Sequence, residues 1–181
     1  MAPRQRPSVL ILTGPPGAGK TTVARLLAAR FDRAVHIESD WFFQVIQAGL
    51  IEPWKPASKE QNEAVMNIVA TAAAGYATAG YFTIVDGIFL PTWFFPPVRD
   101  SLRRAGHRVA YAILRAPLPV CLERASGRAE RPASEGAVVE QLWAGFSELA
   151  DLERHVIESD NRTPSDLAGL IAERLDELEA S

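Results

Sequence analysis

Short apolar runs alternate along the chain with longer segments in which apolar residues recur every three to four positions. The short runs predict buried β-strands, and the longer period predicts amphipathic α-helices. The predicted strands are Val9–Thr13, Ala34–Ile37, Phe82–Asp86, Arg108–Leu114 and His155–Glu158. The predicted helices are Thr21–Phe31, Asp40–Ala48, Ser58–Ala79, Pro96–Ala105, Leu118–Ser126, Ser134–Asp151 and Thr163–Leu178. This alternation indicates a three-layer α/β/α fold with a five-stranded parallel sheet covered on both faces.

Two of the predicted helices begin with residues typical of a capped N-terminus. Thr163 precedes Pro164 and Asp166, which places a capping hydroxyl before a proline at the first helical position. Ser58 is followed three residues later by Gln61, which is the spacing of a capping box. Both starts are therefore expected to be fixed by their own side chains.

A glycine-rich segment connects the first predicted strand to the first predicted helix. It reads Gly14-Pro15-Pro16-Gly17-Ala18-Gly19-Lys20-Thr21 and fits the pattern G-x-x-x-x-G-K-[ST]. In this pattern backbone N–H groups at a helix N-terminus surround the phosphates, the lysine reaches the β- and γ-phosphates, and the hydroxyl ligates Mg²⁺. The sequence therefore predicts a nucleoside triphosphate site formed by Gly14, Gly17, Ala18, Gly19, Lys20, Thr21 and Thr22.

Carboxylates follow the second predicted strand, on the expected acceptor side of the site. Ligands of an open parallel sheet bind outside the carboxyl ends of its strands, and this strand ends in Glu38-Ser39-Asp40. In phosphoryl transfer a carboxylate takes the proton of the attacking hydroxyl, and Asp40 is the predicted base in contact with the acceptor. Two alternatives are that Glu38 is the base, or that Asp40 only caps the next helix.

The third predicted strand ends in Asp86, which is expected to orient Mg²⁺ through water or to hold the acceptor. Gly87 follows it, whereas a motor-type ATPase usually has a second acidic residue there to activate water. The guanine-reading segment Asn-Lys-x-Asp of GTPases does not occur in the sequence. Arg115 and residues 159–164 follow the last two strands and complete the strand-end candidates.

Arginines cluster after the fourth predicted strand. Arg124 and Arg128 are four residues apart, which places them on one face of a helix, and Arg131 follows. We expect an arginine-bearing lid near residues 124–135, in which Arg128 neutralises charge on the transferred phosphate. The alternative is a solvated helix end whose cations complement the helix dipole.

Composition narrows the class of protein. The 181 residues are 48% hydrophobic, enough for a single domain, 1–181, with a substantial core. A formal net charge of −3 disfavours a nucleic-acid partner. The single cysteine, Cys121, excludes an internal disulfide and is expected in the core. No apolar stretch has the length of a membrane span, and the run Val9–Leu12 is too short for a signal peptide, so a cytoplasmic protein is expected.

These motifs together resemble the small P-loop kinases of the nucleoside-monophosphate-kinase-like fold. Within that group the chain is similar to chloramphenicol phosphotransferase-like and gluconate-kinase-like proteins. The similarity rests on Ser39-Asp40, Val85-Asp86-Gly87 and Arg124-x-x-x-Arg128-x-x-Arg131, in addition to the P-loop. The resemblance implies a sheet in the order 2-3-1-4-5, ATP with Mg²⁺, and an aspartate base after the second strand. It also implies that Arg162 and Pro164 lie near adenine.

Aromatic residues are concentrated in the two segments that should border the acceptor. About half of them are expected in the core, with Trp41, Trp54 and Trp93 as the predicted acceptor contacts. Such side chains favour a flat or partly apolar acceptor. The hypothesis is an ATP-dependent kinase for a hydroxyl of a small molecule, including antibiotics and related metabolites. Two alternatives are a nucleoside or nucleotide kinase and a nonenzymatic ATP-binding regulatory module, and the oligomeric state is open.

Overall fold

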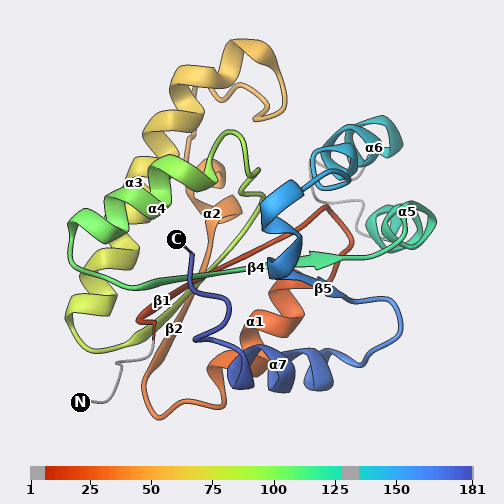
Figure 1. Cartoon of the computed structure of the whole chain (residues 1–181). Helices are drawn as coiled ribbons and strands as arrows, with labels where there is room; N and C mark the ends of the chain where they lie inside the picture. Colours follow the sequence, from red (N-terminus) through yellow and green to blue (C-terminus); the bar gives the residue numbers. More distant parts are fainter. Residues whose placement is uncertain (1–6, 128–134, 181) are drawn as a thin grey trace.

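A computed structural model describes residues 7–127 and 135–180. Its five strands form one parallel sheet in the order β2-β3-β1-β4-β5 (Figure 1), which confirms the order implied by the resemblance. The strands are β1 Val9–Thr13, β2 Ala34–Glu38, β3 Phe82–Asp86, β4 Val109–Arg115 and β5 Val156–Glu158. The carboxyl ends of β1, β2 and β3 therefore lie side by side, and so do the residues that follow them.

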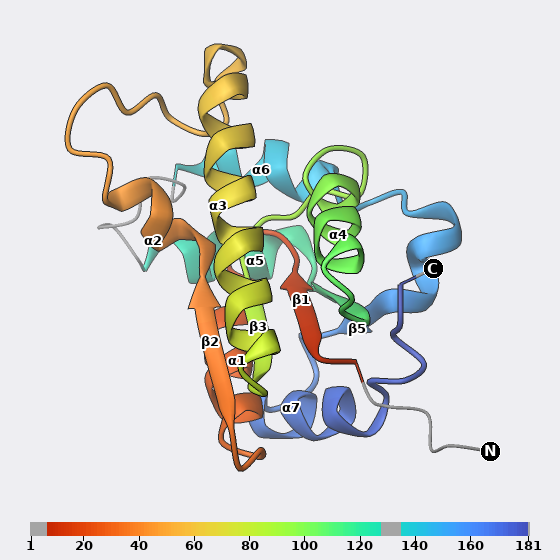
Figure 2. The same cartoon turned by 90° about the vertical axis from the view of Figure 1, so that its left-hand side faces the viewer.

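Helices cover both faces of the sheet. α3 and α4 lie on one face and α1 and α7 on the other (Figures 1 and 2). The bounds are α1 Lys20–Ala28, α2 Ser39–Gln44, α3 Lys59–Thr78, α4 Phe95–Arg104, α5 Leu118–Ser126, α6 Gly136–Ala144 and α7 Pro164–Glu173, with 3₁₀ turns at Pro56–Ser58 and Ala150–His155. None of the helices described here is both long and apolar enough to cross a membrane.

The side chains of β1 point alternately to the two faces of the sheet, so this strand contributes to two hydrophobic cores. Successive side chains of a strand point to opposite faces. Val9 and Ile11 pack beneath α3 and α4, whereas Leu10 and Leu12 pack beneath α1 and α7. All four are fully buried, which is why this strand is a continuous apolar run rather than an alternating one.

The predicted and observed helices differ most in the segment Ser134–Asp151, which the sequence predicts as one helix. α6 ends at Ala144, and a separate 3₁₀ turn begins at Ala150, whose φ of 45° lies in the left-handed region. Phe146, between the two, is 1% exposed and belongs to the core beneath α3 and α4. Packing of this ring therefore breaks a segment whose apolar period favours one helix.

The loop between β3 and α4 is held by hydrogen bonds from two central strands. The Phe89 N–H donates to Thr13 Oγ1 at 2.9 Å, and the Tyr111 hydroxyl donates to the Phe89 carbonyl at 2.8 Å. Phe95 stacks on Tyr111 with ring centroids 3.6 Å apart. Burial raises the pKa of Tyr111, so its hydroxyl remains a donor at all ordinary pH values. The loop is therefore rigidly attached to the sheet.

His155 is a buried neutral imidazole that should make stability depend on pH. It is fully buried, its Nδ1 lies 3.0 Å from the Tyr111 carbonyl, and its Nε2 accepts from Arg154 Nε at 3.1 Å. Burial lowers the pKa of His155, and the Arg154 charge lowers it further. Below about pH 6.5 the histidine is protonated in the unfolded chain but stays neutral in the folded chain. The free energy of unfolding should therefore decrease as the pH is lowered, by at most about 1.4 kcal/mol per pH unit.

Thermal unfolding of the wild type and of His155→Gln at pH 7.5 and 5.5 measures this effect. We expect the melting temperature of the wild type to fall more between the two pH values than that of the variant, since Gln takes up no proton. Equal falls in both proteins would contradict the assignment of His155 as the titrating group.

Candidate active site

The glycine-rich segment forms a tight loop between β1 and α1. Gly17 has a φ of 83°, and a Cβ at this position would lie 2.4 Å from the carbonyl oxygen of Cys121 in α5. Glycine is required because of both the left-handed backbone and this close approach. Cys121 is itself fully buried, which confirms its predicted place in the core. The loop is thus seated directly on α5.

Lys20 is the first residue of α1, and its side chain folds back onto the loop that precedes the helix. Its Nζ donates to the carbonyl oxygens of Gly14 at 2.9 Å and Pro15 at 3.0 Å. The N-cap of α1 is Gly19, and no side chain caps the N–H groups of this helix start. A helix start without a side-chain cap and a lysine ammonium at the same point are features that bind the phosphates of a nucleotide.

Asp86 and Thr21 meet at the carboxyl end of β3. Thr21 Oγ1 lies 3.5 Å from Asp86 Oδ1, and the Asp86 side chain is only 6% exposed. Hydroxyl and carboxylate oxygens are hard donors that suit Mg²⁺, which is held by few protein ligands together with phosphates and water. The two residues therefore fit the predicted metal site.

Sequence reasoning missed a partner of Asp86. His36 Nε2 lies 2.5 Å from Asp86 Oδ2, so the imidazole fixes the carboxylate oxygen opposite to the one near Thr21. The signal was present in the sequence, because His36 is two residues before Glu38 and shares its strand face. The register of β2 and β3 pairs Glu38 with Asp86, which brings that face beside the carboxylate.

Asp40 lies within the first turn of α2. The N-cap of this helix is Glu38 and has no side-chain capping bond, so the alternative that Asp40 is the cap is wrong. Asp40 is exposed and lines the large cavity described below. Glu38 Oε1 instead lies 2.6 Å from Arg25 Nη2 of α1, and Glu38 does not line that cavity. This geometry favours Asp40 over Glu38 as the base, which stays a prediction.

Gly87 explains why no second acidic residue follows Asp86. A Cβ at position 87 would lie 1.9 Å from Ser39 Oγ and 3.0 Å from Phe89 Cε2. Overlap of this kind forces neighbouring groups to move. The glycine thus lets Ser39, the residue before Asp40, pack against the end of β3, so the two carboxylate-bearing strand ends come together.

A cavity of about 290 Å³ opens beside the loop and extends between α2, α3 and α6; we call it the acceptor cavity. At one end it is lined by Lys20, Thr21, Asp40 and Asp86. The rest of its lining comes from segments that are distant in sequence and is mostly apolar: Phe43, Leu50, Trp54, Met66, Ile88, Leu90, Trp93, Phe94 and Leu142. It therefore joins the phosphate loop to a separate binding volume.

The predicted aromatic contacts are only partly brought together. Trp54 and Trp93 line the acceptor cavity, and Trp93 stacks on Phe94 with centroids 4.1 Å apart. Trp41 is 64% exposed and does not line it. The residue lies on the first turn of α2, where the helical period turns it away from Phe43, which is buried and faces the cavity.

The polar start of α3 holds the loop that carries Trp54, and the capping box predicted at Ser58 is wrong. No side chain caps α3; Ser58 Oγ instead donates to the carbonyls of Pro53 or Lys55, and Gln61 clamps Ile51 by accepting from its N–H at 2.9 Å and donating to its carbonyl at 2.7 Å. The same side chains that sequence spacing assigned to a cap therefore fix the outer wall of the cavity. The capping box at Thr163 is confirmed.

A second cavity, of about 240 Å³, borders the phosphate loop and the start of α7; we call it the nucleotide cavity. It brings together Gly17, Ala18, Gly19 and Thr22 of the loop with Arg124, Arg162 and Pro164, all predicted nucleotide contacts. Arg128 and Arg131 of the expected lid lie outside the described residues, so their roles stay predictions.

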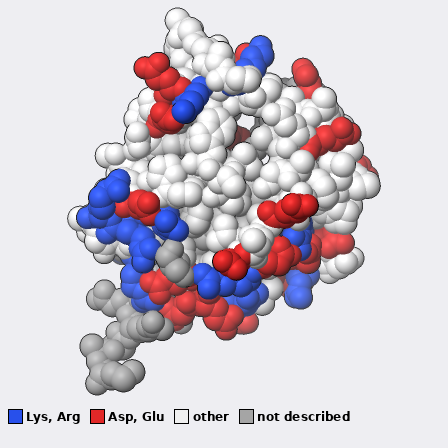
Figure 3. Space-filling view, turned by 45° about the horizontal axis from the view of Figure 1, so that its top comes forward, with Lys and Arg blue, Asp and Glu red and all other residues white. Residues whose placement is uncertain are grey.

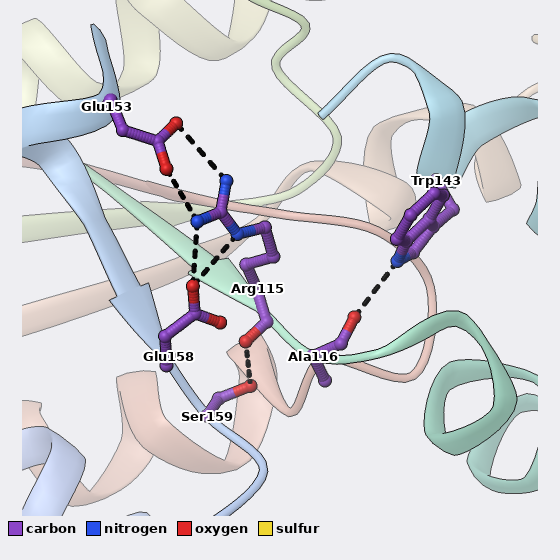
Figure 4. A network of polar contacts seen from close by, with 6 residues as sticks. All are labelled: Arg115, Ala116, Trp143, Glu153, Glu158 and Ser159. Carbon is purple, nitrogen blue, oxygen red and sulfur yellow. Dashed lines mark hydrogen bonds and ion pairs between the residues drawn. The ribbon is translucent and has the colours of Figure 1, made fainter. Parts of the chain in front are cut away.

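Arg115 is a strand-end candidate in the sequence, but in the structure it lies outside the candidate site. Its guanidinium lies 2.6 Å from Glu153 and 2.7 Å from Glu158, and it lines neither cavity (Figure 4). The Ser159 hydroxyl, next to this network, lies 3.1 Å from the Arg115 carbonyl and 3.2 Å from the carbonyl of Ala18. These contacts tie the end of β5 to the phosphate loop, so Arg115 has a structural role, whereas Ser159 also lines the nucleotide cavity.

Comparison with known proteins agrees with this geometry. The family profile described as "AAA domain" matches residues 9–151. The shikimate kinase of Pseudomonas entomophila is 33% identical, with 93% of this chain and 96% of that protein covered. A sugar kinase of Janibacter sp. is 24% identical with a TM-score of 0.66, covering 94% of both chains. The tunicamycin resistance protein of Deinococcus radiodurans is 22% identical with a TM-score of 0.67, covering 98% of this chain and 99% of its own.

The structural likenesses show the fold, and the profile and sequence matches show the family. The resemblance to small P-loop kinases is thereby confirmed, and the kinase relatives are enzymes that act on small molecules. The chain belongs to the P-loop kinase family described as an AAA domain, and it is similar to relatives named as small-molecule kinases.

Proposed function

We propose that this protein transfers the γ-phosphate of ATP to a hydroxyl of a small molecule bound in the acceptor cavity. The observation that carries the proposal is that Lys20 and Asp40 line the same cavity. The donor phosphate and the acceptor hydroxyl can therefore meet in one cavity, as in-line transfer requires.

The proposed step uses Asp40 as the base. Its carboxylate takes the hydroxyl proton while the oxygen attacks the γ-phosphorus, the bond to the β,γ-bridging oxygen breaks, and ADP leaves. Lys20 supplies positive charge to the transferred group. Bound Mg²⁺ would supply further charge neutralisation, held by Thr21 and Asp86. His36 keeps the Asp86 carboxylate in place through the contact at its other oxygen.

The nucleotide cavity is the proposed seat of the adenine and ribose. Arg124 and Arg162 supply cations there, and Pro164 supplies an apolar surface. Since this cavity and the acceptor cavity share Gly17 and Gly19, a nucleotide in the first would extend its phosphates toward the second.

The test is transfer of radiolabel from γ-labelled ATP to a panel of hydroxyl compounds that includes antibiotics, sugars, shikimate, nucleosides and nucleotides. Label in a product other than inorganic phosphate, for at least one non-nucleoside compound, supports the proposal. Label in nucleosides or nucleotides alone would favour a nucleoside or nucleotide kinase. ATP binding with no acceptor turnover would favour a regulatory module.

A further inference from the structure

The charges around the acceptor cavity have one predominant sign. Among its described lining residues, Asp40, Glu52 and Asp86 are carboxylates, and Lys20 is the single lysine or arginine. Lys20 belongs to the phosphate end, where its Nζ donates to the carbonyls of Gly14 and Pro15. The lining residues thus place no cation at the acceptor end.

The lysine that follows the lining residue Trp54 is paired with a carboxylate. Lys55 Nζ lies 2.9 Å from Glu52 Oε2, and this hydrogen bond lowers the pKa of Glu52, so Glu52 is a carboxylate at neutral pH. Figure 3 shows a hollowed face on which uncharged side chains predominate, with lysines, arginines and carboxylates gathered toward its margins. A negatively charged acceptor would therefore meet no free cation among the described residues of this wall.

The apolar part of the cavity lining is formed mostly by side chains that are buried or half-buried in the fold. Phe43, Met66 and Phe94 are buried core residues that reach the cavity surface, and the half-buried Trp54 and Trp93 complete it. The Trp54 loop is clamped by α3, and the loop that carries Trp93 is fixed to the sheet, as described above. A preformed apolar wall binds apolar surface without a large cost of ordering side chains.

We infer that the acceptor is an alcohol that carries no carboxylate or phosphate group and has an extended apolar or aromatic body. An anionic group at the acceptor end would lose its water and gain no cationic partner among the described lining residues, which is strongly unfavourable. An apolar body would gain contact with the aromatic and aliphatic wall. The inference rests on the proposed function, because it assigns this cavity to the acceptor. It distinguishes the chain from relatives named for shikimate, which is a carboxylate.

The test compares two probes that differ in one group. Binding of 3-phenyl-1-propanol and of 3-phenylpropionate to the full chain at pH 7.5 is measured by saturation-transfer NMR, which needs no catalysis. We expect the alcohol to bind at least about tenfold more tightly than the acid. Equal or tighter binding of the acid would overturn the inference.

Two kinds of variant assign the signal to this cavity. Trp93→Ala should weaken binding of the alcohol severalfold, since it removes part of the apolar wall. Gln141→Arg adds a cation at an exposed lining position and should strengthen binding of the acid about twofold to fivefold, whereas the uncharged Gln141→Met should not. Unchanged alcohol binding in Trp93→Ala would show that the probe binds elsewhere and would overturn the inference.

Failure of the inference and failure of the proposed function give different results. Tight binding of the acid, together with labelled shikimate in the transfer assay, would support a kinase and overturn the apolar acceptor. Preference for the alcohol, with transfer to neutral apolar alcohols but not to shikimate, supports both the kinase function and the apolar acceptor. Preference for the alcohol with no transfer to any compound of the panel would support the binding class and contradict the kinase.

Discussion

Replacement of Asp40 by Asn is expected to lower the turnover number by about two to four orders of magnitude and to leave the affinity for ATP nearly unchanged. The amide keeps the size of the side chain but cannot take the hydroxyl proton. Asp40 is exposed and lies in the first turn of the short α2, so the variant should fold normally. The measurements are the rate of radiolabel transfer to the best acceptor of the panel and the dissociation constant for ATP.

Glu38→Gln is the matched control for this prediction. Glu38 is two residues away and forms an ion pair with Arg25, but it does not line the acceptor cavity. Removal of its charge should therefore change turnover far less than removal of the Asp40 charge. Near-normal turnover in Asp40→Asn, or a larger loss in Glu38→Gln, would move the role of base away from Asp40.

The central strands could be predicted from sequence because one physical signal determines them. β1 and β3 begin and end where predicted, since a strand buried on both faces is an apolar run bounded by polar or glycine residues. The phosphate loop could be predicted for a similar reason: its glycines, lysine and threonine are required by local backbone geometry. In both cases the pattern that reveals the element lies within a few consecutive residues.

The features that sequence reasoning missed depend on contacts that residue spacing alone does not specify. Ser58 has the spacing of a cap, yet its hydroxyl bonds to the loop before it. Arg115 ends β4, where a site residue would lie, yet the carboxylates of Glu153 and Glu158 pair with it. His36 shares the strand face of Glu38, and the register of β2 with β3 brings that face beside Asp86. Local patterns predict which groups are polar, and tertiary packing selects their partners.

Replacement of Lys20 by Ala is expected to impair ATP binding and phosphoryl transfer together. An ammonium that contacts phosphate oxygens contributes charge-assisted hydrogen bonds, so the dissociation constant for ATP should rise about tenfold or more. Loss of one group that stabilises transition-state charge typically lowers turnover by a further two to three orders of magnitude. Equilibrium binding of ATP and the rate of radiolabel transfer measure the two effects separately.

The pattern of effects, rather than the loss of activity, identifies the role of Lys20. Its Nζ also bonds to the carbonyls of Gly14 and Pro15, so the melting temperature must be compared with that of the wild type to exclude a collapsed loop. Lys59→Ala is the control, because Lys59 is 73% exposed and lines neither cavity. Unchanged ATP affinity in a folded Lys20→Ala protein would contradict the phosphate site. Weakened affinity in Lys20→Ala with normal affinity in Asp40→Asn would separate the donor side from the acceptor side of one cavity.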